Sequence, residues 1–422
     1  MILEALFTLI SAILLLYSVR HVIFTIVALR GSKTPKENIC KDYQPSVTVL
    51  IPARNEEKVI GRILKRMSEL TYPKEKLQII VINDGSRDKT GEIAEKFSEK
   101  HDNIEVIHRS PLKGGKGKAS ALNEGIKHAK GDIIICFDAD YYPQVDIIEK
   151  LVAPLADEKV AAVQGRIVVI NEPENLITRL VALERVGGYC IGQKARENLG
   201  LIPQFGGTAG GFKRKIVEEL GGLSEDILAE DTDLTFKLFL AGYRVCYVNE
   251  AESYEEAVNS FNSYWRQRLR WAIGHMQCAL KHLIPVIKSR KLSLKQKIDA
   301  IFLLNVYFVP IFMAIAWIIG GILVFNGPSI FDIALWSPIP FLTYASVGNF
   351  APFFEIGMGM YADRRAKTCK ILPLLFPMFL YNVVICTFAL IKLCVCKLLR
   401  RKIGWDKTPH HGRETVITEK YK

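Results

Sequence analysis

The chain lacks any C-x-x-C pair, although it has 422 residues and nine cysteines. The odd number and the scattered positions of these cysteines argue against a disulfide framework. Zinc-finger and RNP patterns are also missing from the sequence. The formal net charge of +12 therefore points to a membrane surface and to anionic substrates, and we expect no nucleic acid partner.

A signal-peptide cleavage site of the A-x-A type is absent from the first apolar run, residues 5–29. This run is longer than a typical h-region and can cross a bilayer, which takes about 20 residues. We expect residues 1–30 to be a retained transmembrane anchor; a cleaved signal peptide is the alternative. Four basic residues follow the run: Arg30, Lys33, Lys36 and Lys41. The positive-inside rule then places the following soluble region in the cytoplasm.

Composition divides the chain into a soluble part and a membrane part. Charged and apolar residues are mixed from about residue 40 to 295, and three apolar segments follow at about 299–325, 329–361 and 371–396. We predict a multi-pass protein of the cell membrane with five units: an anchor at 1–30, a cytoplasmic domain at 40–260, amphipathic interface helices at 261–295, a transmembrane region at 296–397 and a basic tail at 398–422.

The charges around the C-terminal segments leave the number of membrane spans open. Three crossings would place the basic stretch KLLRRK outside the cell, against the positive-inside rule. The loop YADRRAK, residues 361–367, is also typical of a cytoplasmic segment. We therefore expect one segment to be re-entrant or interfacial, and Pro373 and Pro377 favour the segment 371–396.

Short β-branched runs alternate with helical patterns between residues 46 and 140. Strands are predicted at 46–57, 77–86, 103–109 and 131–140, and helices at about 56–70, 87–100 and 118–129. This alternation predicts an α/β domain with a largely parallel sheet. Ligands of such sheets bind beyond the carboxyl ends of the strands. Polar clusters follow three of the strands: Asn55-Glu56, Asn83-Asp84 and Asp138-x-Asp140.

Asp138 and Asp140 lie two residues apart at the end of a predicted strand. In an extended backbone, residues i and i+2 point in the same direction. We therefore expect both carboxylates to converge on one hard cation, Mg²⁺ or Mn²⁺, which prefers oxygen ligands. An ordinary polar turn after a strand is the alternative interpretation.

Two glycine-rich stretches are candidate ligand loops. Residues 113–118, KGGKGK, precede a predicted helix but lack the Walker A spacing. Backbone N–H groups at the start of that helix, together with Lys116 and Lys118, suit a diphosphate, although a solvated loop explains the pattern equally well. The second stretch, residues 205–214, has four glycines around Thr208, which allow either close approach to a ligand or a turn.

Three acidic residues, Glu230, Asp231 and Asp233, stand at the start of a helix predicted within residues 228–245. Acidic side chains at this position satisfy free N–H groups and the helix dipole, so capping explains at least one of them. A general base would occupy the same position if a substrate bound at that helix end.

The stretch YWRQRLRW, residues 264–271, combines three arginines with two tryptophans. If it is helical, Gln267, Arg270 and Trp271 share one face. That face offers an amide, a guanidinium for phosphate and a ring that can stack on a sugar. The remaining residues Arg266, Arg268 and Leu269 are expected to point elsewhere. Trp and Arg are also common in membrane-interface helices, and we expect both interpretations to hold for different faces.

Six motifs in this order, PARNEE, INDGS, GKASALN, DAD, AED and QRLRW, resemble the processive family 2 glycosyltransferases, which include cellulose, chitin, hyaluronan and poly-N-acetylglucosamine synthases. The resemblance covers roughly residues 46–275. The layout with one N-terminal span is most similar to the poly-β-1,6-N-acetylglucosamine synthases. The resemblance implies an α/β GT-A domain embedded between transmembrane helices, with a nucleotide-sugar donor, a glycan or lipid-linked acceptor, and Mg²⁺ or Mn²⁺.

The resemblance also implies roles for single residues. Contacts to the nucleotide-sugar fall to Ala53, Glu56, Asp84, Lys118 and Asp138. The cation would be held by Asp138 and Asp140, and Asp231 would be the catalytic base with Glu230 beside it. The acceptor side comprises Thr208, Gln267, Arg270 and Trp271, with the last three also near the diphosphate. The family's T-E-D reads Ala229-Glu230-Asp231 here, and its C-terminal W-x-x-T-x-R element has His410 in place of arginine.

The implied activity is an inverting hexosyl transfer from a UDP-sugar, such as UDP-GlcNAc, to a growing β-linked polysaccharide, with export of the polymer as a further expectation. The alternative is a non-processive transferase that adds one sugar to a lipid carrier or glycolipid. The Q-x-x-R-W pattern favours the processive interpretation. A third interpretation is a membrane-anchored sugar- or nucleotide-binding protein without catalytic activity. The sequence identifies no accessory subunit.

Overall fold

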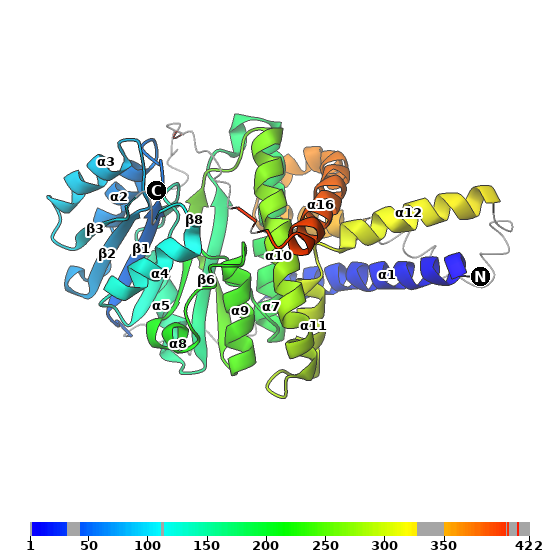
Figure 1. Ribbon diagram of the computed structural model, residues 1–422, viewed down its shortest axis with the longest axis horizontal. Coiled ribbons are helices and arrows are strands. Elements are labelled where there is room, and N and C mark those ends of the chain that lie inside the picture. Colours follow the sequence, from blue (N-terminus) through cyan, green and yellow to red (C-terminus); the bar gives the residue numbers. More distant parts are fainter. Residues whose placement is uncertain are drawn as a thin grey trace.

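The computed structural model describes residues 2–31, 43–110, 114–326, 350–401, 403–404 and 412. A domain built around one sheet forms one end of the molecule (Figure 1). Two long helices, α1 (Ile2–Leu29) and α12 (Val309–Asn326), extend side by side away from it. The predicted tail motif at 405–413, apart from Gly412, lies outside the described residues, as do residues 329–349 of the second C-terminal apolar segment.

The sheet has eight strands in the order β3-β2-β1-β4-β7-β6-β8-β5. Their bounds are β1 Val47–Ala53, β2 Leu77–Asn83, β3 Ile104–His108, β4 Ile133–Cys136, β5 Tyr142–Pro143, β6 Val160–Val169, β7 Gly210–Lys213 and β8 Arg244–Glu255. The first four strands pair in parallel, which confirms the four predicted strands within slightly shorter bounds.

The sheet is mixed: β6 and β8 also pair in parallel, in line with the prediction of a largely parallel sheet, but β7 and β5 depart from it. Strand β7 runs antiparallel to both β4 and β6, and β5 runs antiparallel to β8. A Cβ atom on Gly211 would lie 2.2 Å from the carbonyl oxygen of Ile134, so only glycine fits there. Glycine weakens a strand pattern in the sequence, and for this reason β7 could not be recognised in residues 205–214.

Helices cover both faces of the sheet, which explains why the central strands are continuous apolar runs. On one face, Val49 and Ile51 of β1 pack with α2 (Ile60–Ser68) and α5 (Ile147–Val152), and α3 (Thr90–Ser98) lies on the same side. On the other face, Leu50 packs with α4 (Lys118–His128), α8 (Arg214–Glu219) and α9 (Glu230–Ala241). The carboxyl ends of β1, β2 and β4 lie at one edge of the sheet, because these strands pair in parallel.

The second half of the chain is helical around this domain. After β6 come α6 (Leu176–Val186), a π-helical turn η5 (Gly187–Gln193) and α7 (Lys194–Leu199). After β8 come α10 (Phe261–Lys288) and α11 (Leu294–Leu304). The chain ends with α15 (Ala351–Ala362), η7 (Ala366–Leu374) and α16 (Leu375–Leu398).

Two helices, Ile2–Leu29 and Thr368–Leu398, are long and apolar enough to cross a membrane. Among the residues that the structure describes, a third span would require α11 and α12 to act together, but the pair is bent by 70°. The predicted apolar segment 299–325 is therefore two helices and not one. In α1, His21 pairs with Glu355 of α15 and the Arg20 guanidinium lies 4.7 Å from the Phe24 ring. These polar residues are accommodated by protein contacts, so the C-terminal half of α1 belongs to the packed part of the molecule.

Candidate active site

The loops after β1 and β2 are joined at the carboxyl edge of the sheet. The Asp84 N–H donates to the Ala53 carbonyl at 2.8 Å. Asn55 has a φ of 53°, and its side-chain oxygen accepts from the Arg87 N–H at 2.8 Å. Three of the predicted nucleotide-sugar residues, Ala53, Glu56 and Asp84, are thus placed at one edge, and all three are buried.

The Asp84 carboxylate holds the glycine-rich loop. One oxygen accepts from Arg109 Nη1 at 2.6 Å and the other from the Gly115 N–H at 2.9 Å. Arg109 also donates to Ser120 Oγ of α4 at 2.9 Å. Asp84 therefore fixes the approach of the chain to Lys118, a structural contribution that the sequence did not reveal.

Lys118 connects the glycine-rich loop to the D-x-D motif. Its Nζ lies 2.5 Å from Asp138 Oδ1. The backbone N–H of Asp138 donates to Thr208 Oγ1 at 3.0 Å. Three separate motifs, carried by residues 113–118, 136–140 and 205–214, thus meet at Asp138.

The expectation that Asp138 and Asp140 lie in extended backbone is wrong. The Tyr141 N–H donates to the Asp138 carbonyl at 3.1 Å, which closes a turn before β5. Asp140 is buried, and its Oδ2 accepts from the Glu256 N–H at 3.3 Å. The chain turns here because Tyr142 and Pro143 form the edge strand on β8. The two side chains consequently have separate protein partners.

The donor groups fit a divalent cation of the Mg²⁺ or Mn²⁺ type. Such ions are often held by one or two carboxylates together with substrate phosphates and water. Within the described residues, no group of three or more His, Cys, Asp or Glu gathers. The Asp138 side chain is 32% exposed and has a cationic group, the Lys118 ammonium, 2.5 Å from Oδ1. Asp138 therefore offers an accessible hard ligand, with Asp140 in the same turn.

Glu230 and Asp231 form a half-buried carboxyl pair at the start of α9. Burial, and then the charge of Asp231, raises the pKa of Glu230 to about 7, although Lys118 and Arg270 act in the opposite direction. Burial also raises the pKa of Asp231, against hydrogen bonds from Thr232 and the charge of Lys118. Carboxyls with raised pKa values near cationic groups are typical of acid–base sites.

The capping explanation holds for one of the three acids on α9. Asp231 Oδ1 accepts from the Thr232 N–H at 2.7 Å. Asp233 is fully buried and instead accepts from Ser224 Oγ at 2.6 Å and His282 Nε2 at 2.7 Å. Burial would raise the Asp233 pKa, but hydrogen bonds from His282 and Lys281 hold it well below its usual range. Asp233 thus connects α9 to α10.

Trp271 is flanked by two guanidinium groups. Arg268 lies 4.7 Å and Arg185 5.1 Å from its ring centroid. Arg268 pairs with Glu184, and Arg185 donates to Glu255 at 2.5 and 3.0 Å. The expectation that Arg268 points away from Trp271 is therefore wrong, because residues three apart on a helix are neighbours as much as residues four apart.

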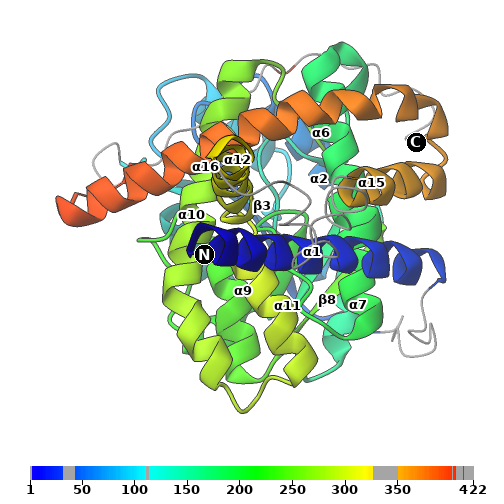
Figure 2. The ribbon, with the colours of Figure 1, turned by 90° about the vertical axis from the view of Figure 1, so that its right-hand side faces the viewer.

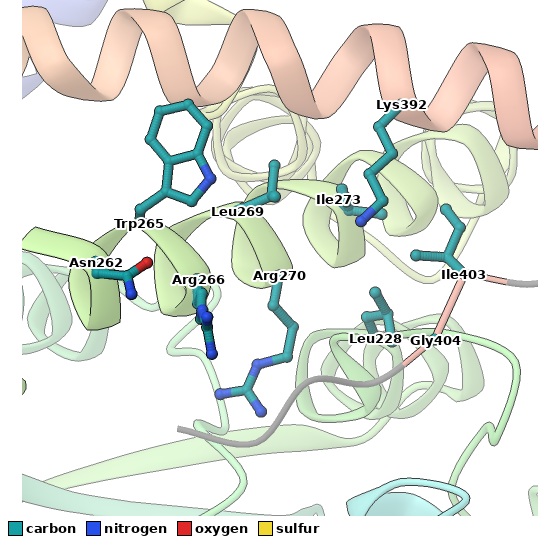
Figure 3. A pocket seen from close by; sticks show the side chains of 10 residues that line it. All are labelled: Leu228, Asn262, Trp265, Arg266, Leu269, Arg270, Ile273, Lys392, Ile403 and Gly404. Carbon is teal, nitrogen blue, oxygen red and sulfur yellow. The ribbon is translucent and has the colours of Figure 1, made fainter. Parts of the chain in front are cut away.

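Arg270 lies on a different side of α10, beside a pocket of about 280 Å³ (Figure 3). Arg266 and Leu269 line this pocket with Arg270, whereas Trp271 does not, so the expectation that Arg266 and Leu269 point away from the face of Arg270 is also wrong. Gln267 is partly buried and does not line the pocket. The remaining lining residues are Leu228, Asn262, Trp265, Ile273, Lys392, Ile403 and Gly404.

Sequence reasoning missed several residues at this site. The rings of Tyr189 and Tyr247 lie 6.3 Å apart, and burial raises the pKa of Tyr189, with a smaller contribution from the Asp231 carboxylate. His275 Nε2 lies 3.4 Å from Thr232 Oγ1, and burial lowers the His275 pKa to about 4, so the ring is neutral. Nothing in the pattern around Gly187-Gly188 marks the π-helical turn that carries Tyr189.

The family profile described as Glycosyl transferase family 2 matches residues 48–221. A curated relative, Probable glycosyltransferase YdaM of Bacillus subtilis (strain 168), is 33% identical over 374 residues, which are 87% of this chain and 88% of that protein. The Mannosyltransferase PcManGT from Pyrobaculum calidifontis, solved in complex with GDP-Man and Mn²⁺, has a TM-score of 0.60 and 24% identity, and the match covers 86% of this chain and 98% of that one.

Two further relatives match over shorter stretches. The Beta-monoglucosyldiacylglycerol synthase of Nostoc sp. (strain PCC 7120 / SAG 25.82 / UTEX 2576) is 33% identical over 63% of this chain and 56% of its own length. The Poly-beta-1,6-N-acetyl-D-glucosamine synthase of Staphylococcus aureus (strain COL) is 30% identical over 63% of both chains. This chain thus matches less than two thirds of either protein.

These findings confirm the GT-A type of fold with a mixed sheet, and they confirm that the protein is an enzyme of the hexosyltransferase type. The interpretation as a binding protein without catalytic activity is therefore wrong. The chain is a member of glycosyl transferase family 2.

Proposed function

We propose that the protein is a membrane-bound, inverting glycosyltransferase that moves a hexose from a nucleotide-sugar, with a UDP-sugar such as UDP-GlcNAc as the expected donor, to a growing β-linked glycan. The observation that carries this proposal is the half-buried carboxyl pair Glu230–Asp231 at the start of α9; the charge of Lys118 lowers both pKa values, against burial, and the charge of Arg270 lowers that of Glu230. Two cationic side chains, Lys118 and Arg270, thus act on the carboxylates at the N-terminal end of α9. The three groups come from three different motifs of the sequence.

The donor would bind along the carboxyl edge of the sheet. Ala53, Glu56 and Asp84 would contact the nucleoside, because they line the ends of β1 and β2. Lys118 and Asp138 would lie at the diphosphate, where the Lys118 ammonium neutralises phosphate charge. A divalent cation held by Asp138 and Asp140 would supply electrostatic stabilisation of the departing diphosphate.

Asp231 would take the proton from the acceptor hydroxyl. A general base needs a pKa close to the working pH, and burial moves the Asp231 pKa in that direction. Glu230 shares the same surroundings and would adjust the charge on Asp231. Attack from the face opposite the diphosphate would invert the anomeric centre in one displacement.

The acceptor would approach along α10. Trp271 would stack on its terminal sugar, with the guanidinium groups of Arg185 and Arg268 within 5.1 Å of the ring centroid to position it. Thr208 lies at the D-x-D motif through its bond to Asp138, and Gln267 and Arg270 would contact the acceptor and the leaving diphosphate. This arrangement supports an extended glycan as acceptor.

A second candidate function is the addition of a single sugar to a lipid. The pocket beside Arg270 favours it, because its wall combines apolar side chains such as Leu228, Leu269 and Ile273 with three cationic ones from Arg266, Arg270 and Lys392. A lipid with an anionic head group matches that chemistry. One relative acts in glycolipid synthesis, as its name Beta-monoglucosyldiacylglycerol synthase states.

The chain's organisation enters the proposal as well. We assign residues 40–260 to a cytoplasmic catalytic domain, anchored in the cell membrane by 1–30 and by the region 296–397, with residues 261–295 at the interface and 398–422 as a basic tail. The apolar lengths of α1 and of the Thr368–Leu398 helix support a membrane location.

The test is to incubate membranes containing the protein with a panel of nucleotide-sugars and Mg²⁺ or Mn²⁺. Release of nucleoside diphosphate identifies the donor, and the size of the labelled product separates the two functions. A polymer or ladder supports the first proposal, and a single lipid-linked sugar supports the second. No release with any donor, from folded protein, contradicts both.

A further inference from the structure

Helix α16 begins at the catalytic domain. Two residues before η7 make ion pairs with that domain: Arg365 Nη1 lies 2.8 Å from Glu172 Oε2, and Asp363 pairs with Arg166 of β6. The four side chains in these two ion pairs are largely buried, with only 10–17% of their surface exposed. The segment before α16 is therefore attached to the same side of the membrane as the sheet.

The chain after α16 also returns to the catalytic domain. Ile403 and Gly404 line the pocket beside Arg266 and Arg270 of α10. Farther on, the Gly412 N–H donates to Glu256 Oε2 at 3.2 Å. Both ends of the helix thus contact the domain that carries Asp231.

The middle of α16 packs along α10. The ring of Tyr381 lies 5.9 Å from that of Phe261, and the ring of Phe388 lies 5.8 Å from that of Trp265. Ala389 of α16 is buried in the same cluster as Ala272 of α10. Because α10 carries three arginines in this stretch, the surface on which α16 lies is not a membrane core.

The opposite side of α16 is an apolar stripe. Five side chains at helical spacing are 38–55% exposed: Phe376, Leu380, Val384, Ile391 and Val395. The helix has 24 residues, which corresponds to about 36 Å at 1.5 Å per residue. An upright helix of this length would place its two ends on opposite faces of a hydrocarbon core about 30 Å thick.

The two views of the molecule agree on the direction of α16. Helix α12 extends away from the domain in Figure 1 and is seen end-on in Figure 2, where α16 crosses it almost at full length; α1 runs obliquely and is seen along much of its length in both views. If α12 follows the membrane normal, α16 runs close to the membrane plane. Basic residues gather at its C-terminal end: Lys392, Lys397, Arg400 and Arg401.

We propose that α16 lies in the plane of the cytoplasmic leaflet, with its stripe in the acyl-chain boundary and its other face on α10. The partner is the lipid surface, and the basic end lies among lipid phosphates. The inference rests on the proposed membrane-bound function and replaces a third crossing by a surface helix. Residues 361–367 and the basic tail then remain cytoplasmic, as the positive-inside rule requires.

The depth of the stripe in a bilayer tests this proposal. Single cysteines at Phe376, Val384 and Ile391 are spin-labelled in full-length protein reconstituted into phosphatidylcholine–phosphatidylglycerol vesicles. Five native cysteines, Cys40, Cys246, Cys369, Cys394 and Cys396, are first changed to serine; the other four are buried. Accessibility to oxygen and to a water-soluble nickel reagent gives each depth. The proposal predicts one shallow depth for all three positions, with Lys127→Cys on exposed α4 as the aqueous control.

An upright helix gives a different result. Positions 376 and 391 would then differ in depth by roughly 22 Å, at 1.5 Å per residue, and position 384 would be the deepest. That gradient overturns the proposal, as does labelling of all three by the aqueous reagent alone. Nucleoside diphosphate release is measured on the same samples. Shallow, equal depths without transfer would count against the proposed function and not against the placement of α16.

A second measurement concerns the two ends. Arg364→Cys and Arg400→Cys, in the same background, are exposed to a membrane-impermeant maleimide in inside-out and right-side-out vesicles. Both are expected to react only in inside-out vesicles, together with Lys127→Cys. Reaction of Arg400→Cys from the opposite side contradicts the in-plane placement.

Discussion

The ammonium of Lys118 lies 2.5 Å from Oδ1 of Asp138, and this pair joins the glycine-rich loop to the D-x-D turn. Burial opposes the charge on Lys118, but the carboxylates of Asp138 and Glu230 outweigh it and raise the Lys118 pKa. Lys118 is therefore cationic at neutral pH. It lies at the proposed donor site and acts on the proposed catalytic pair Glu230–Asp231, so its charge should influence both.

Removal of this charge should change the pH dependence of transfer. Burial first, and then the Asp231 charge, raises the Glu230 pKa to about 7, while Lys118 lowers it. A carboxyl with a raised pKa is protonated below that pKa, so the rate should fall as the pH drops through the region just below 7. In Lys118→Met the carboxyl pKa values rise further, and the acid limb of the kcat profile should move to higher pH. Lys127→Met, an exposed change on α4, should leave the limb in place.

The position of the Trp271 ring should depend on the planar guanidinium of Arg268. Lysine keeps the charge but not the stacking geometry, and a cation over an aromatic ring contributes about 1 kcal/mol. Arg268→Lys is expected to raise the KM for acceptor roughly fivefold at an unchanged donor KM. The exposed substitution Arg290→Lys is the control. An equal rise in both KM values would show that Arg268 acts on the whole site.

Asp233 should contribute to stability and not directly to the chemical step. Loss of one partner from a buried charge network costs roughly 3 kcal/mol, so Asp233→Asn should lower the free energy of unfolding by about that amount. The Asp233 pKa is depressed in the folded state. Its contribution is present above the unfolded pKa of about 4 and is lost as the pH falls below it.

The stability difference between Asp233→Asn and wild type is measured by urea unfolding in detergent. It should be full at pH 7 and should shrink toward pH 3. Asp226→Asn, an exposed change nearby, serves as the control. A difference that is independent of pH would contradict the assignment of an ionised Asp233.

Chelation should stop transfer if Asp138 holds a divalent cation. We expect EDTA to reduce nucleoside diphosphate release to background and Mn²⁺ or Mg²⁺ to restore it. Asp138→Asn should weaken Mn²⁺ binding and so raise the half-saturating Mn²⁺ concentration by at least about tenfold. Full activity in EDTA would contradict the proposal that a divalent cation takes part in transfer.

The parallel half of the sheet could be predicted because β1, β2, β3 and β4 are continuous β-branched runs between turn residues. The antiparallel strand β7 was missed because Gly210 and Gly211 give it no strand pattern, although their lack of side chains is what allows close packing on β4. The sequence pattern of a strand indicates how its side chains are buried. It does not indicate how closely the backbones of neighbouring strands approach it.

The candidate residues were found by motif, but their neighbours depend on three-dimensional contacts. A spacing of two residues could not show that Asp138 and Asp140 lie in a turn, since that follows from the pairing of β5 with β8. Likewise, Arg185 reaches Trp271 from α6, 86 positions earlier in the chain. The sequence alone contains no signal for such a contact.

The most direct test of the proposed chemistry is Asp231→Asn in purified protein, with donor binding and nucleoside diphosphate release measured on the same sample. Loss of a general base costs about 10²–10⁴-fold in rate. The proposal predicts a loss of this size with unchanged donor affinity and an unchanged melting temperature. Release at the wild-type rate from Asp231→Asn would contradict it.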